Sequence, residues 1–260
     1  MRWVTLSSGY RNALTTYMIS LIKSYLLSPT MYIGLSTMSI MMGLIGARGA
    51  HMPIAIWFSM TYPLFGFSMT GVITRSTLIE VGAFNYLTRH GGVSPVKLII
   101  TVVLANTLIQ VVTAPLFTVL MIAAYYLAGV KLGALGVTPM FLPAIFFLAL
   151  FTSALGIAAG LITAGRALPA RLMDFMPSLF ISLFLFSLFT PDNLRPYNPF
   201  TAIMTLLTAS LSTVTSPNTG PNLLISYATL SITILALLAL SLALARRVRE
   251  VNVYDISLGL

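Results

Sequence analysis

The sequence predicts an all-α, polytopic membrane protein, and its composition, its apolar segments and its charge placement all support this fold class. Of the 260 residues, 58% are hydrophobic and only 7% are charged, and the mean hydropathy is +0.96. Soluble domains carry about 25% charged residues, so this chain has too few charges to cover a water-exposed surface. A membrane-spanning helix needs about 20 apolar residues, and six segments reach or approach that length: 31–47, 52–74, 98–128, 140–164, 172–190 and 223–245.

Residues 10–27 precede the first apolar segment and are expected to form an amphipathic helix in the membrane interface. Ser28 and Pro29 then end this helix and start the first span. The alternative is that residues 10–47 form one long bent span. At 100° per residue, Asn12, Thr16 and Lys23 share the polar face. The opposite face holds Tyr10, Leu14, Tyr17, Met18, Leu21 and Tyr25.

The distribution of Lys and Arg predicts the orientation, because cytoplasmic loops of membrane proteins carry an excess of these residues. With the N-terminus inside, only Arg48, Lys131 and Arg195 of the 14 basic residues lie outside. We therefore expect a multi-pass protein of the plasma membrane with both termini in the cytoplasm. The basic residues expected inside are Arg2, Arg11, Lys23, Arg75, Arg89, Lys97, Arg166, Arg171, Arg246, Arg247 and Arg249.

Residues 191–217 form an insertion before the last span. Its apolar part, 199–214, is short and is bounded by Pro196, Pro199 and Pro217. A full seventh span here would place Arg246 and the basic residues after it outside, against the charge distribution. The segment is therefore predicted to be a short re-entrant or outer helix.

Several function classes lack support in the sequence. No phosphate-binding loop and no hydrolase motif occurs, so the chain is not expected to be an enzyme. Cysteine is absent, and His51 and His90 have no acidic residues nearby in the sequence, so neither a metal nor a cofactor is expected in this chain. The net charge of +9 is explained by membrane topology, and nucleic acid is not an expected partner. The predicted spans contain essentially no ionisable residues, so energy for any pumping must come from elsewhere.

The longest polar interruption is the segment 75–97, which is expected to be a cytoplasmic loop on which another protein acts. It reads EVGAFNYL at 80–87, followed by Ser94, Pro95 and Lys97. Together with the order of the elements, this resembles the type-2 ABC transporter permeases, whose corresponding loop carries an E-x-G-T-x-x-x-L pattern. Ala83 stands where that pattern has Thr, and the acidic residue common just upstream is missing. The Asn198-Pro199 pair in the insertion is also similar to the family.

The resemblance implies that residues 1–260 form a single permease domain of an ABC exporter for a hydrophobic or amphipathic substrate. Its partners would be a second permease subunit, identical or related, and two P-loop ATPase subunits that hold ATP and Mg. The segment 75–97 would be the coupling loop, in which residues 80–87 would form a short coupling helix that docks on the ATPase and that ends at Gly91 and Gly92. Glu80 would pair with a basic residue of the ATPase, or with Arg75 or Arg89 inside the loop. The implied coupling residues are Glu80, Gly82, Phe84, Tyr86, Leu87 and Arg89.

Three polar residues lie on one face of the third span, because Asn106, Gln110 and Thr113 are spaced at i, i+4 and i+7. Such side chains either hydrogen-bond to neighbouring helices or line a substrate path. In the fourth span, Gly156 and Gly160 form a G-x-x-x-G pattern, which predicts a close contact with another helix.

Two other classes of function stay open at this level. The chain could be a channel or facilitator that needs no ATPase, because no energy-coupling residue is evident in its spans. It could also be a membrane assembly subunit that transports nothing itself.

Overall fold

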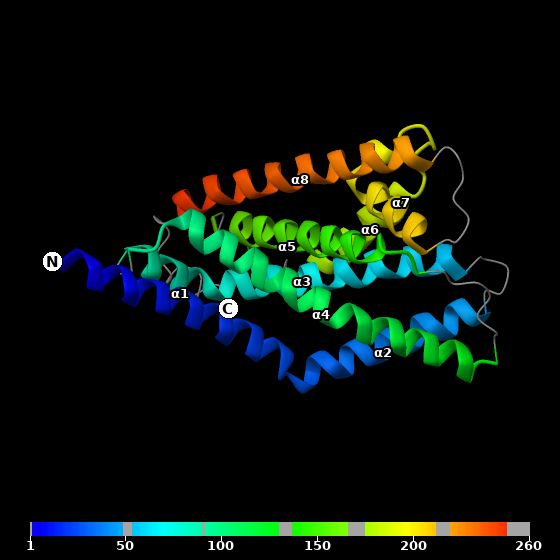
Figure 1. Ribbon diagram of the computed structural model, residues 1–260, viewed down its shortest axis with the longest axis horizontal. Coiled ribbons are helices and arrows are strands. Elements are labelled where there is room, and N and C mark those ends of the chain that lie inside the picture. The colour runs from blue at the N-terminus through cyan, green and yellow to red at the C-terminus, as the bar shows by residue number, and fades with distance from the viewer. Residues whose placement is uncertain are drawn as a thin grey trace.

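The structure is a computed structural model that describes residues 2–48, 54–89, 92–129, 137–165, 175–211 and 219–248. Within these residues the regular structure is helical, and the long helices run side by side along the longest axis of the molecule (Figure 1). The elements are α1 (Arg2–Leu26), α2 (Pro29–Arg48), α3 (Ile54–Arg89), α4 (Pro95–Leu127), α5 (Phe141–Gly165), α6 (Met176–Ser187), the short 3-10 helix η2 (Arg195–Tyr197), α7 (Pro199–Leu211) and α8 (Thr219–Val248).

Four of these helices are long and apolar enough to cross a membrane, which identifies the fold of a multi-pass membrane protein. The apolar segments are Ile56–Leu78, Pro95–Leu127, Phe141–Ala164 and Asn222–Arg246. The bent pair Leu14–Leu26 and Met31–Arg48 would add a fifth span if it crosses as one unit. Six full spans are therefore not reached in the described part of the chain. The predicted span at 172–190 contains α6, whose 12 residues cover only about 18 Å.

The break between α1 and α2 falls where Ser28 and Pro29 predict it. α1 ends at Leu26 and α2 starts at Pro29, with an angle of 52° between the two parts. Proline suits the first position of a helix because it lacks the amide hydrogen that would have no partner there. α1 begins at Arg2, earlier than the predicted residue 10. A separate interfacial helix and one bent span are both compatible with this angle.

Residues 75–89 are helical, but they continue α3 and do not form a separate coupling helix within a loop. α3 continues without a break from Ile54 to Arg89, and the described connection to α4 consists of residues 92–94. No proline lies between residues 74 and 89, so nothing in the sequence forces the helix to stop there. The predicted helix end at Gly91 and Gly92 agrees with the end of α3 at Arg89 and with a φ of 62° at Gly92, while Gly91 itself lies outside the described residues.

α5 lies in the centre of the bundle and packs against α3, α4, α7 and α8. The G-x-x-x-G pattern forms the predicted close helix contact. A Cβ atom on Gly156 would lie 2.9 Å from the carbonyl oxygen of Thr70, and one on Gly160 would lie 2.9 Å from that of Thr74. The Thr74 hydroxyl donates a hydrogen bond of 3.2 Å to the Gly156 carbonyl oxygen. The backbones of α3 and α5 can approach this closely only because α5 carries no side chains at these two positions.

α7 extends along only half of the length of the bundle. Phe200, in its first turn, packs on Phe67 and Phe151, with ring centroids 5.3 and 5.7 Å away. Phe67 is the middle residue of the apolar segment Ile56–Leu78, and Phe151 lies close to the middle of Phe141–Ala164. At the other end of α7, the carbonyl oxygen of Ser210 accepts a hydrogen bond of 2.9 Å from the Thr138 amide, just before α5. α7 therefore runs from the middle of the bundle to the end at which α5 begins.

Candidate functional site

The end of the bundle at which α3 passes into α4 carries most of the described basic residues. α1 begins there, α8 ends there, and the turn between α3 and α4 lies beside them (Figure 1). The basic residues of these elements include Arg2, Arg75, Lys97 and Arg246. Arg48, the last residue of α2, belongs to the opposite end. The charge asymmetry read from the sequence is therefore also an asymmetry between the two ends of the folded molecule.

The extension of α3 beyond its apolar segment is anchored by a small hydrophobic core. Val81 and Phe84 are buried and belong to one cluster with Leu98 and Ile99 of α4 and Leu161 of α5. Leu87 packs against the same cluster from the last turn of α3. Two of the predicted coupling residues, Phe84 and Leu87, therefore hold the extension onto the bundle. This packing makes residues 79–89 a continuation of the rigid bundle.

The outer face of the extension is formed by other residues. Ala83 is exposed and Tyr86 has 66% of its surface exposed, while Gly82 is half-buried. Beyond α3, Gly92, Ser94, Val96 and Lys97 are also exposed. The Ser94 hydroxyl accepts a hydrogen bond of 3.3 Å from the Lys97 amide and so caps α4, with Pro95 in its first turn. The side chain of Arg89 lies outside the described residues. Among the predicted coupling residues whose side chains are described, Tyr86 thus has the largest exposed fraction.

Glu80 contacts α1. Its carboxylate accepts a hydrogen bond from the hydroxyl of Tyr17, so its described contact is neither Arg75 nor Arg89. Burial between the helices raises the pKa of the Glu80 carboxyl above its ordinary value of 4.5, and the hydrogen bond from Tyr17 partly offsets this rise. One turn earlier on α3, the Ser76 side chain shares a hydrogen bond with Tyr25, two turns further along α1. Two tyrosines therefore fasten α1 to the extension of α3.

The three polar residues of α4 are buried and make hydrogen bonds. Gln110 donates to the Ser153 hydroxyl at 3.0 Å and accepts from the Thr152 hydroxyl at 2.9 Å, which joins α4 to α5. Asn106 and Thr113 donate to carbonyl oxygens of their own helix, at 3.0 and 2.9 Å. The cavity beside Gln110 holds only about 10 Å³, which is at the lower limit for a single water molecule. These contacts support the helix-packing interpretation rather than an open substrate path.

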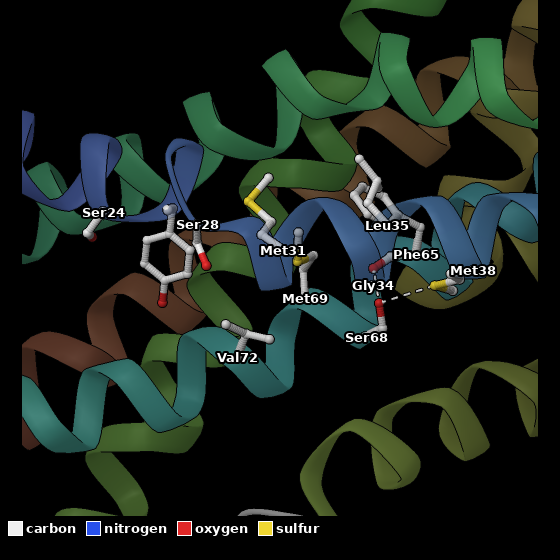
Figure 2. A pocket seen from close by; sticks show the side chains of 11 residues that line it. Ser24, Ser28, Met31, Gly34, Leu35, Met38, Phe65, Ser68, Met69 and Val72 are labelled. Carbon is white, nitrogen blue, oxygen red and sulfur yellow. Dashed lines mark hydrogen bonds between the residues drawn. The ribbon is translucent and has the colours of Figure 1, made fainter.

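A larger cavity of about 470 Å³ lies between the α1–α2 bend and α3 (Figure 2). Apolar side chains of α2 and α3 line its length, and hydroxyl-bearing residues of α1 and the bend lie at one end. The Ser68 hydroxyl contacts the Met38 sulfur at 3.7 Å across the cavity. The lining residues are Ser24, Tyr25, Ser28, Met31, Gly34, Leu35, Met38, Phe65, Ser68, Met69 and Val72.

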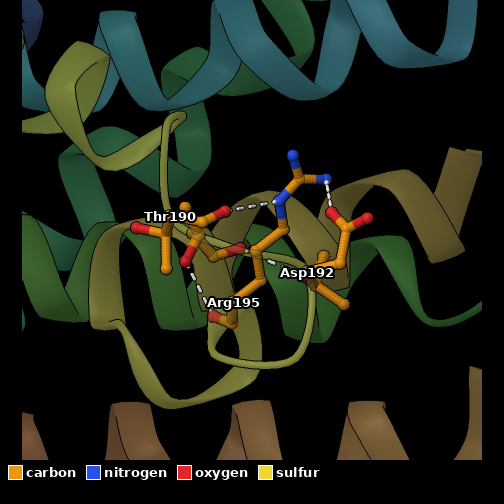
Figure 3. Close-up of polar contacts among 5 residues, drawn as sticks. Thr190, Asp192 and Arg195 are labelled. Atoms are coloured by element: carbon orange, nitrogen blue, oxygen red, sulfur yellow. Dashed lines mark hydrogen bonds and ion pairs between the residues drawn. The ribbon is translucent and has the colours of Figure 1, made fainter.

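The connection between α6 and α7 is a compact turn held by polar contacts (Figure 3). Arg195 forms an ion pair of 3.0 Å with Asp192 and donates a hydrogen bond of 3.3 Å to the carbonyl oxygen of Thr190. The Asn198 side chain accepts from the Phe200 amide at 3.0 Å, which caps the start of α7, and donates to Thr190 at 3.1 Å. The Asn198-Pro199 pair therefore starts a helix, as the resemblance implies.

Sequence reasoning missed the partners of the polar groups. The sequence places Tyr17 only on an apolar helix face, and it carries no signal for the roles of Thr152 and Ser153. The signal for Tyr17 was its spacing of eight residues from Tyr25, which places both hydroxyls on one side of a helix. Nothing in the sequence pairs that side with Glu80 and Ser76. Within the described residues no group of three His, Asp or Glu side chains could hold a metal ion.

Comparison with known proteins adds no relative. The chain matches no protein-family model, no curated protein and no solved structure.

Proposed function

We propose that the chain is the permease subunit of an ABC exporter that moves a hydrophobic or amphipathic substrate with energy from separate ATPase subunits. The observation that carries the proposal is the extension of α3 beyond its apolar segment. From Leu78 to Arg89 the helix continues for about 16 Å. It is fastened to α1 by Tyr17 and Glu80 and to α4 and α5 by Val81 and Phe84. A connecting segment without a partner would not need such support.

This geometry can transmit a push from outside the membrane into the bundle. A partner that binds the exposed side of the extension at Tyr86 would move α3 as one rigid body. Because Gly156 and Gly160 lock α3 to α5, a displacement of α3 would be passed on to the centre of the bundle. Binding energy for the closed ATPase pair could in this way shift an equilibrium between two arrangements of the helices.

The end of the molecule at which α1 begins and α8 ends also supports the proposed orientation and partners. The basic residues gathered there favour a cytoplasmic location of both termini in the plasma membrane. The ATPase subunits on that side would hold ATP and Mg, since this chain has no phosphate-binding loop. A second permease subunit, identical or related, would complete the transporter.

The test is co-purification from the native host with a pair of matched variants. Tyr86→Ala removes the exposed aromatic side chain of the extension, and Tyr197→Ala removes one that is 60% exposed in η2, which packs against α7 and α8. We expect wild type and Tyr197→Ala to retain a P-loop ATPase in roughly one-to-one ratio. Tyr86→Ala should lower the retained ATPase by about tenfold or more, as truncation of an interface hot spot does.

Two results would overturn the proposal. One is a chain that purifies without an ATPase and conducts ions in liposomes, which would favour a channel or facilitator. The other is equal ATPase retention by both tyrosine variants together with unchanged retention when residues 79–89 carry Ala83→Arg as well. That result would mean that the ATPase does not contact the extension of α3.

A further inference from the structure

The cavity between the α1–α2 bend and α3 exists because α2 packs on α4 and makes few contacts with α3. Gly43 and Gly46 allow this, since side chains there would collide with Ala124 and with Tyr125 and Trp57. The 52° bend turns α1 back toward the extension of α3, where Tyr17 and Tyr25 fasten it. Between these two attachments the helices diverge and enclose about 470 Å³.

The lining of the cavity changes in character along its length. Met31, Leu35, Met69 and Phe65 make one part apolar, and methionine side chains adapt easily to a flexible apolar ligand. Ser24, Tyr25 and Ser28 gather hydroxyl groups at the bend (Figure 2). The volume lies within the range of about 300–1,000 Å³ that is common for small-molecule sites. The site thus has an apolar part and a polar end, as an amphipathic ligand requires.

The depth of the cavity matches one leaflet of a bilayer. Measured from Phe67 in the middle of its apolar segment, Val72 lies about 7 Å and Arg75 about 12 Å along α3. Half of the hydrocarbon thickness is about 15 Å. The hydroxyl-lined end, where Tyr25 meets Ser76, is therefore at the level of the lipid headgroups. The apolar part reaches from there to the middle of the bilayer.

The charge beside the hydroxyl-lined end is positive. Arg75 is exposed one turn beyond Val72 on the same side of α3, whereas Lys23 lies on the face of α1 opposite Tyr25. The nearest described acidic residue, Glu80, lies more than one further turn along α3 and accepts the hydrogen bond from Tyr17. A phosphate group at this end would be attracted by Arg75, whereas a cationic headgroup would be repelled.

We propose that this cavity binds one anionic phospholipid from the surrounding leaflet. Its phosphate lies beside Arg75 at the hydroxyl-lined end, and one acyl chain lies between Met31 and Met69. The site is independent of the proposed ATPase partner, because it requires only that the helices cross a membrane in this arrangement. A lipid held here fills the space between the α1–α2 bend and α3 and stabilises the position of α1.

Gly34 provides a clean way to block the site. It lines the cavity, and a Cβ atom added to it would meet no atom within 4 Å. Gly34→Leu therefore places a side chain in the cavity with no clash at its Cβ atom, and leucine is a better helix former than glycine. Ile33→Phe is the matched control, since it adds bulk at the same depth on a side chain that is 66% exposed and does not line the cavity.

The experiment uses the purified full chain in nanodiscs that contain equal amounts of phosphatidylglycerol and phosphatidylcholine. The protein is then extracted into mild detergent, and the retained lipid is counted by mass spectrometry. We expect one phosphatidylglycerol per chain, preferred about tenfold or more over phosphatidylcholine, for wild type and Ile33→Phe. Gly34→Leu should retain at least fivefold less, and Arg75→Gln should lose the preference for the anionic lipid.

The outcomes separate cleanly. Equal retention of phosphatidylglycerol by wild type and Gly34→Leu would overturn the proposal, because the lipid would then be bound elsewhere. Equal retention of the two lipids by wild type would also overturn it, since Arg75 would have no role. The thermal midpoints of the variants in detergent show whether each is folded. A wild type that releases its ATPase but keeps the lipid would leave this site intact while removing the proposed function.

Discussion

Glu80 shows how one side chain can be read differently in sequence and in structure. In the sequence it is a carboxylate between two arginines and resembles part of a docking motif. In the structure it is half-buried, lies on α3 facing α1, and accepts a hydrogen bond from Tyr17. Its first role is therefore to fasten α1, and any contact with a partner must be made by exposed neighbours such as Ala83 and Tyr86.

The raised pKa of Glu80 predicts a pH-dependent stability. A carboxyl whose pKa is higher in the folded state favours folding most when protonated, so the wild type loses stability as the pH rises from about 4.5 through the folded pKa. Glu80→Gln keeps an acceptor for Tyr17 and removes the ionisation. We expect thermal midpoints of the two proteins in detergent to be similar at acidic pH. The variant should become the more stable one as the pH rises, and parallel curves would contradict this prediction.

Gln110 is predicted to act through packing. Gln110→Leu leaves the hydroxyls of Thr152 and Ser153 without their partner on α4. Interhelical hydrogen bonds of this kind contribute about 0.6 kcal/mol on average in membranes, up to about 1.7. We therefore expect a loss of about 1 kcal/mol in unfolding experiments, with substrate selectivity unchanged in transport assays. A variant of normal stability with altered selectivity would instead favour a substrate path.

At the level of helices, the contact between α3 and α5 depends on glycine. Gly156→Ala places a Cβ atom 2.9 Å from the Thr70 carbonyl oxygen and against Ile73, so the helices must separate. We expect a loss of about 1–3 kcal/mol in unfolding free energy, which is typical of overpacking. Gly34→Ala is the control on α2, since nothing lies within 4 Å of its added Cβ and helix propensity alone should make it neutral or up to about 1 kcal/mol more stable. Equal effects of the two substitutions would mean that the contact is not tight.

The helices α6 and α7 raise a different question, because neither is long enough to cross a bilayer. Their 12 and 13 residues cover about 18 and 20 Å. Phe184 of α6 and Phe200 of α7 both pack on Phe67, in the middle of an apolar segment. The turn between them, which contains Asp192 and Arg195, therefore starts and ends beside helices that are within the hydrocarbon layer of the bilayer. The Asn198 cap and the Arg195 contacts supply backbone partners that lipid could not provide.

The whole molecule makes a topology prediction that the absence of cysteine renders easy to test. Ser94 and Val137 are exposed and lie at opposite ends of α4 and the connection that follows it. With the basic end in the cytoplasm, Val137→Cys should react with a membrane-impermeant maleimide in intact cells. Ser94→Cys should react only after the cells are opened. The reverse pattern would invert the orientation and place the extension of α3 outside, where no ATPase could reach it.

Local sequence patterns predict much of the architecture. Apolar segments separated by polar ones predict helices wherever the structure describes them, because a chain in lipid must satisfy its backbone within each segment. The break at Ser28 and Pro29 and the helix start at Asn198 and Pro199 were predictable for the same reason, since proline limits the backbone next to it. The G-x-x-x-G pattern indicated a close contact, although it did not name α3 as the other helix.

The tertiary structure decided the features that depend on two segments at once. The polarity of 75–97 predicts a loop with a short helix at 80–87, but burial of Val81 and Phe84 against α4 and α5 stabilises one continuous helix as far as Arg89. The hydrogen bond from Tyr17 to Glu80, the hydrogen bond from Thr152 to Gln110 and the cavity beside Gly34 also depend on two segments each. A hydropathy pattern reports how each residue partitions into lipid, whereas the choice between touching helices rests on shapes and hydrogen-bond partners that lie far apart in the chain. That is why the sequence predicts which segments are helices, and only the folded bundle shows which face of each helix is left for a partner.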